Sequence, residues 1–248
     1  MTVDRLSIEN YAGRLVPRVL GLVLAGTAAI GTIVLAAGRA AGPVRAAGWG
    51  ALAATSIVFV AGLIDDLVPG GPRGLRNHVR VLAGGRVTTG ILKVFVVAAA
   101  AIVAIALQDK GSGGARIAGV VLVAACANVW NGLDVRPGRA LKAFLIVQVG
   151  LWGVDLASLP TLPGVVAGAV LALGPDLRER AMLGDGGANL LGFTVGLGLF
   201  LVLPTSGIVG GAIVAVALNI LADTVTFSRV IGATRALAWV DRLGRRPE

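Results

Sequence analysis

Four aspartates stand where long apolar stretches of the sequence end. Asp65 and Asp66 occur in GLIDDL, Asp134 in NVWNGLD and Asp185 in MLGDGGANLLG. Clustered carboxylates repel one another unless a cation lies between them, and Mg²⁺ commonly joins carboxylates to substrate phosphates. The glycines around Asp185 permit close backbone approach to a phosphate at the start of the following helix. These residue types predict a metal and phosphate site, although an aspartate pair at a helix end is also a common solvated cap.

The segments that must position these aspartates are apolar enough for a membrane. Hydrophobic residues make up 56% of the 248 residues and charged residues 14%, where a soluble domain has about 25%. The apolar runs are continuous rather than alternating, which favours helices over a β-barrel. We therefore expect an all-α, polytopic integral membrane protein with about eight transmembrane helices. The predicted spans are 15–37, 46–64, 91–107, 117–133, 141–157, 162–174, 188–203 and 207–225.

The basic residues predict how these spans are oriented. With the N-terminus inside, 18 of the 22 Lys and Arg residues fall in cytoplasmic segments, and the other four are Arg39, Arg45, Lys110 and Arg116. Lys and Arg accumulate on the cytoplasmic side of membrane proteins. Both termini and all four aspartates are therefore expected on the cytoplasmic face of a multi-pass protein of a bacterial plasma membrane. The same rule explains the net charge of +9 without a nucleic-acid partner.

We expect one transmembrane domain over 1–248, in which 226–248 form a basic cytoplasmic tail. Its stretch from Phe227 to Leu243 mixes apolar residues with arginines and suits an amphipathic helix on the inner leaflet. The spacing of Gly192 and Gly196 permits close helix packing, and Cys126 lies in an apolar run, where packing is its expected role.

Several stretches together resemble the polyprenyl-phosphate N-acetylhexosamine-1-phosphate transferases, the family of MraY and WecA. They are NYAGRLVPRVLGLVL, GLIDDL, TTGILK, NVWNGLDVRPGRALK and MLGDGGANLLG, in the family's order and over nearly the whole chain. The resemblance implies Mg²⁺-dependent transfer of a sugar-1-phosphate from a UDP-sugar to a polyprenyl phosphate carrier at the cytoplasmic face. The bilayer is then a partner, and a homodimer is plausible by analogy.

The resemblance also implies roles for individual residues. Asp65, Asp66 and Asp134 match catalytic positions, and Asp185, with help from Asp66, matches the metal site. Asn131 matches a position near the nucleotide, and Lys93 a lysine suited to a phosphate. Two further residues are candidates for substrate contact: Asn128 and His78. Asn128 and Asn131 are also suited to helix capping or an inter-helix hydrogen bond, and His78 is equally suited to a solvated loop.

The chain departs from the family at one important place. The family carries a His-rich motif in a late cytoplasmic loop, whereas His78 is this chain's single histidine. The alternative is a catalytically degenerate member that binds a lipid or nucleotide or partners another membrane protein. A transporter ranks third, because transport sites usually lie near the bilayer midplane and these acidic residues lie at helix ends.

Overall fold

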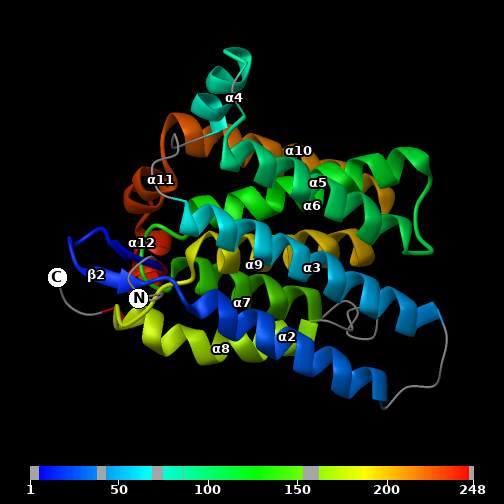
Figure 1. The fold of residues 1–248 in the computed structure, drawn as a ribbon, viewed down its shortest axis with the longest axis horizontal. Helices are drawn as coiled ribbons and strands as arrows, with labels where there is room; N and C mark the ends of the chain where they lie inside the picture. The colour runs from blue at the N-terminus through cyan, green and yellow to red at the C-terminus, as the bar shows by residue number, and fades with distance from the viewer. Residues whose placement is uncertain (1–5, 38–42, 69–74, 86, 153–161, 246–248) are drawn as a thin grey trace.

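The structure, a computed structural model, describes residues 6–37, 43–68, 75–85, 87–152 and 162–245. A short N-terminal hairpin precedes a bundle of helices (Figure 1). The elements are β1 (Ser7–Glu9), β2 (Leu15–Pro17), α2 (Leu20–Ala37), α3 (Pro43–Leu67), α4 (Leu75–Ala83), α5 (Thr89–Ala106), α6 (Gly113–Leu133), α7 (Arg139–Trp152), α8 (Leu162–Leu177), α9 (Gly184–Val202), α10 (Thr205–Thr224), α11 (Phe227–Ala233) and α12 (Arg235–Arg242).

The long apolar helices confirm a mostly helical, multi-pass membrane protein. Each of the eight predicted apolar segments corresponds to a helix, from α2 and α3 through α5–α10. Within the described residues, five helices are long and apolar enough to cross a bilayer: α3, α5, α6, α9 and α10. The apolar parts of α2 and α8 are shorter. A ~30 Å hydrocarbon core needs about 20 helical residues, which is why length separates these two groups.

Helix α9 forms the centre of the bundle and is the most deeply buried of the five long apolar helices (Figure 1). It packs against α3 and α6 through glycines. A Cβ atom on Gly62 of α3 would stand 2.6 Å from the Cα of Gly186, and one on Gly192 would stand 2.3 Å from the carbonyl oxygen of Cys126. These approaches leave no room for a side chain, so the expected packing roles of Gly192 and the buried Cys126 are confirmed.

The N-terminal hairpin is the part of the fold that the all-α prediction missed. Strands β1 and β2 pair antiparallel, with Ile8 opposite Val16. The Asn10 side chain accepts hydrogen bonds from the backbone N–H groups of Ala12 and Arg14, and Gly13 adopts a φ of +72° in the turn. Local side-chain bonding of this kind favours a turn over a helix. The predicted span from residue 15 therefore begins only at Leu20.

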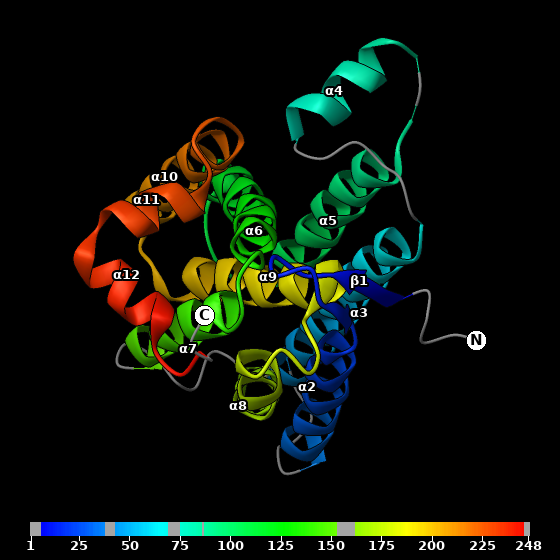
Figure 2. The same cartoon turned by 90° about the vertical axis from the view of Figure 1, so that its left-hand side faces the viewer.

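Several of the charged segments that connect the helices lie at one end of the bundle. The hairpin and helices α11 and α12 lie at this end, the left of Figure 1, and Figure 2 looks onto it. The tail predicted as one amphipathic helix forms two short ones, because the backbone breaks at Thr234, which is extended rather than helical. In Figure 2, α11 and α12 run along the rim beside α10 and α7, while α4 lies on the far side.

Candidate functional site

Lys93 joins carboxylates from two other helices at the charged end of the bundle. Its ammonium nitrogen lies 2.7 Å from Oδ2 of Asp65 at the end of α3 and 2.5 Å from Oδ2 of Asp185 at the start of α9. Its side chain is only 10% exposed. The Thr88 hydroxyl caps α5 by accepting from the Ile91 N–H, which starts the helix one turn before Lys93. Three helices thus supply one acid–lysine cluster, which we define as Asp65, Lys93 and Asp185.

Asp66 faces a different partner although it follows Asp65 directly. Its Oδ1 accepts a 2.6 Å hydrogen bond from the Arg18 guanidinium, which also donates to the Asp66 carbonyl oxygen. Its Oδ2 accepts from the backbone N–H of Gly186 at 3.2 Å. Gly184 precedes this contact with a φ of +69°, and a Cβ atom there would stand 2.6 Å from Asp66 Oδ2. Glycine is therefore required at this turn, both for its backbone angle and for space.

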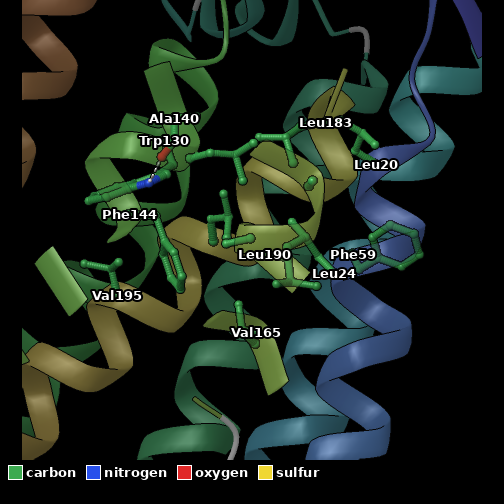
Figure 3. Packing of buried hydrophobic residues seen from close by; sticks show 14 of the residues in the cluster. Leu20, Leu24, Phe59, Trp130, Ala140, Phe144, Val165, Leu183, Leu190 and Val195 are labelled. Atoms are coloured by element: carbon green, nitrogen blue, oxygen red, sulfur yellow. Dashed lines mark hydrogen bonds between the residues drawn. The ribbon is translucent and has the colours of Figure 1, made fainter. Parts of the chain in front are cut away.

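Residues at the end of α6 complete the surroundings of the cluster. The Asn131 amide nitrogen lies 3.5 Å from Asp185 Oδ2, at the outer limit of a hydrogen bond. The Trp130 indole donates to the Ala140 carbonyl oxygen at 3.2 Å, amid packing that includes Phe144 and Leu190 (Figure 3). This bond ties the end of α6 to the start of α7, and so it fixes where the turn between them begins.

Asp134 lies just past the end of α6 and is partly buried. Burial raises the pKa of its carboxyl well above the ordinary value, and the nearby carboxylates of Asp176, Asp185 and Asp66 raise it further. The Gly138 N–H, in the same turn, donates to Asp176 Oδ2 at 2.8 Å. This end of the bundle therefore holds a carboxyl that retains its proton to higher pH than an exposed aspartate does.

Two predicted site residues do not join the cluster. The Asn128 amide donates to Oδ1 of Asn219 at 2.5 Å, so it links α6 to α10. This is the inter-helix alternative that the sequence left open. His78 lies in α4 rather than in a loop, and its side chain is outside the described residues.

Sequence reasoning missed Arg18 as the partner of Asp66, and it missed Asp176. The sequence identifies Arg18 only as one of many arginines on the predicted cytoplasmic side. Arg18 lies in the stretch NYAGRLVPRVLGLVL, but nothing in that stretch points to Asp66. Arg18 and Asp176 each meet their partner only through packing between segments far apart in the chain. A buried charged side chain needs a partner of opposite charge. This rule is the one basis on which a basic partner for Asp66 could have been expected.

The geometry of the cluster bears on the predicted Mg²⁺ ion. Among the described residues there is no group of three or more His, Cys, Asp or Glu side chains placed to hold a metal ion. The Lys93 ammonium already lies between Asp65 and Asp185, and the Arg18 guanidinium engages Asp66. Because Lys93 offsets one of the two carboxylate charges of the cluster and Arg18 offsets the charge of Asp66, the arrangement does not fit a divalent Mg²⁺ ion as it stands. The Mg²⁺ requirement and the metal role of Asp185 stay predictions.

The sequence is similar to two curated bacterial transporters. It is 30% identical over 166 residues to the Na(+)/H(+) antiporter NhaA of Paramagnetospirillum magneticum, covering 67% of this chain and 39% of that protein. It is 31% identical over 181 residues to the Na(+)/H(+) antiporter NhaA of Rhizorhabdus wittichii, covering 71% and 44%. The chain thus spans about two fifths of the length of these relatives. No protein-family model matches it, and no solved structure matches it significantly.

These similarities contradict the predicted membership of the sugar-1-phosphate transferase family. The phosphoglycosyltransferase activity, the partners UDP-sugar and polyprenyl phosphate, and the alternative of a degenerate member of that family are corrected with it. The similarity to antiporters favours a transporter, the class that the sequence analysis ranks third. The quoted motifs are short strings of Asp, Asn and Gly at helix ends. The structure uses such strings for ion pairs and for tight helix contacts, which other membrane proteins also need.

Proposed function

We propose that this chain exchanges a monovalent cation for protons across the membrane, with Na⁺ as the first cation to test. The observation that carries the proposal is the bridge that Lys93 forms between Asp65 and Asp185. The curated relatives, which bear the name Na(+)/H(+) antiporter, supply the class of transported ions. The proposal includes the predicted topology of eight spans with both termini cytoplasmic, on which the cluster faces the cytoplasm.

The charges of the cluster suit exchange of one ion for another. Two carboxylates and one ammonium sum to a single negative charge when all three groups are ionised. One Na⁺ ion or one proton neutralises that charge, and binding of either disfavours binding of the other. Ionisable groups at membrane depth are costly, which makes a functional role the default interpretation for them. Competition for one negative charge is the simplest basis for coupled, opposite movement of the two cations.

Asp134 adds a second group that can hold a proton near the cluster. Its raised pKa follows from burial and from neighbouring carboxylates, Asp185 among them. A cation that binds at Asp185 neutralises the negative charge that raises the pKa of Asp134. Binding of the cation therefore lowers that pKa and favours release of the Asp134 proton. The geometry thus supplies a physical link between cation binding and proton release.

The test measures proton movement in vesicles that contain only the purified full chain. A pH-sensitive dye inside the vesicles reports alkalinisation or acidification when a Na⁺ gradient is imposed, with K⁺ and Mg²⁺ gradients run in parallel. We expect Na⁺-dependent proton flux that Asp65→Asn and Lys93→Ala abolish. Asp109→Asn is the matched control, because Asp109 is exposed and precedes α6 at the opposite end of the bundle.

Three outcomes would overturn the proposal. The first is no flux with Na⁺ or K⁺. The second is flux that survives Asp65→Asn. The third is equal loss in Asp109→Asn, which would trace the effect to general damage. A response to Mg²⁺ alone would replace Na⁺ with a divalent ion and return Asp185 to the role of metal ligand.

A further inference from the structure

Helix α12 is held to the bundle by one of its faces only. Arg139 of α7 forms two hydrogen bonds with Asp241, at 2.8 and 3.0 Å, and Arg245 forms a third at 2.6 Å. The Lys142 ammonium donates to the backbone carbonyl oxygens of Val240, Asp241 and Leu243. Ala238, one turn before Arg242, is buried. These contacts fix the rotation of α12 about its axis.

The fixed rotation turns a basic and aromatic face outward. Arg235, Trp239 and Arg242 follow one another at spacings of four and three residues, so they share one side of the helix. All three are exposed, Trp239 by 63%, and Leu243 beside them is 43% exposed. An indole between two guanidinium groups combines an apolar ring with positive charge. This combination matches the boundary between phospholipid headgroups and acyl chains.

The position of α12 places this face at that boundary. Helix α10 is a candidate span that ends at Thr224, and α11 and α12 follow it within a few residues. Only 17% of the apolar window of α10 is buried, which leaves most of that helix for lipid. Figure 2 shows α11 and α12 at the rim, beside α10, rather than over the middle of the bundle. A helix at this rim lies level with the headgroups of the lipids that surround α10.

We infer that the Arg235–Trp239–Arg242 face of α12 binds anionic phospholipid headgroups at the membrane surface. The two guanidinium groups pair with lipid phosphates, and the indole lies among the headgroups and upper acyl chains. Anionic rather than zwitterionic lipid is specified by charge, because both arginines are exposed on the side of the bundle where the basic residues concentrate. This inference is independent of the proposed ion exchange.

Quenching of Trp239 fluorescence by brominated lipids tests the inference. The full chain is placed in nanodiscs of equal parts phosphatidylglycerol and phosphatidylcholine, with bromines near the headgroup on one lipid at a time. The signal of Trp239 is the difference between the native protein and Trp239→Phe, which leaves the other tryptophans in place. We expect quenching by brominated phosphatidylglycerol to exceed that by brominated phosphatidylcholine about twofold or more.

Two variants connect this preference to the arginines. The double variant Arg235→Gln with Arg242→Gln is expected to bring the ratio of quenching to one, whereas Arg80→Gln in α4 leaves it unchanged. Arg80 is the matched control because it is exposed and lies on the far side of the bundle end from α12 (Figure 2). The inference is overturned by a ratio of one in the native protein, by a ratio that survives the double substitution, or by no quenching with either lipid.

Discussion

The ammonium nitrogen of Lys93 lies 2.5 Å from Oδ2 of Asp185, although 92 positions separate the two residues in the chain. This ion pair joins α5 to the buried central helix α9, and the bond to Asp65 adds the end of α3. A cation held by carboxylates from two helices fixes the distance between them. Replacing or neutralising one of these groups therefore alters both stability and ion binding.

Lys93→Ala is expected to destabilise the protein by about 3 kcal/mol, because it leaves two carboxylates near each other without their cation. This value is at the lower end of the cost of removing one partner from a buried ion pair. The Asp185 side chain is 33% exposed, so water solvates part of the charge that Lys93 leaves unpaired. Unfolding in mixed micelles with increasing SDS measures the change. Adding Asp65→Asn to Lys93→Ala should restore part of the stability. Additive losses in the double variant would show that the two groups do not interact.

Gly62→Ala is expected to disturb the cluster without touching a charged group. The added methyl group would stand 2.6 Å from both the Cα and the nitrogen of Gly186, and backbone atoms cannot move aside as a flexible side chain does. Helix α3 must then shift from α9, with a cost of about 1–3 kcal/mol and a loss of proton flux. Gly26→Ala on α2 is the matched control, since nothing lies within 4 Å of its added Cβ. Equal effects of the two substitutions would contradict this account of the contact.

The membrane helices and the gathering of acidic residues were predictable, because each depends on strong local signals. Apolar runs marked α2, α3 and α5–α10, of which five in the described residues are long and apolar enough to cross a bilayer. The positions of Lys and Arg predicted that Asp65 and Asp185 would share one side. The N-terminal hairpin was missed because its signal is a single side chain, Asn10, that bonds the backbone of a short turn.

Partner choice within the site was not predictable from local patterns. Asp65 and Asp66 are adjacent, yet one pairs with Lys93 and the other with Arg18. Successive residues on a helix point about 100° apart, so these two adjacent aspartates face different partners. The motif resemblance assigned Asp65 and Asp66 to one catalytic site, because a match of sequence motifs contains no information on the direction of each side chain. The same limitation led to the transferase prediction that the similarity to antiporters contradicts.

Gln148 offers a way to stabilise the protein. It lies on α7 and is 1% exposed, and neither its amide nitrogen nor its amide oxygen has a hydrogen-bond partner in the described structure. A buried polar group without a partner costs about 1–3 kcal/mol. Gln148→Leu, which keeps a similar volume, should therefore raise the unfolding free energy by about 1 kcal/mol or more.

Gln108→Leu is the matched control, because the Gln108 amide donates to the Ala104 carbonyl oxygen at 3.1 Å. No gain is expected there. Unfolding in SDS again measures both variants. A loss of stability in Gln148→Leu would show that the amide has a partner in the membrane, with an internal water molecule as the first candidate.

The attachment of α12 should be lost in acid. Burial works to raise the pKa of the Asp241 carboxyl, but the hydrogen bond from Arg139 and the charges of Arg139, Arg245 and Lys142 outweigh it and lower the pKa below 3.8. A carboxyl with a lowered pKa in the folded state stabilises that state fully above its unfolded pKa, and the contribution is lost as pH falls through the folded value. The attachment should therefore be intact above about pH 5 and weaken below about pH 4.

Hydrogen exchange of the α12 backbone amides, corrected for the intrinsic pH dependence of exchange, measures this attachment. Protection should be constant between pH 7 and pH 5 and should fall only as the pH drops below about 4, through the lowered pKa of Asp241. In Asp241→Asn, protection should already be low at pH 7 and should show no further step, because the titrating group is gone. The amides of α9 provide the internal reference, since that helix is buried and Asp241 does not contact it in the described structure. A fall of equal size in α9 would instead indicate unfolding of the whole bundle, and an unchanged α12 in Asp241→Asn would show that Asp241 does not hold the helix.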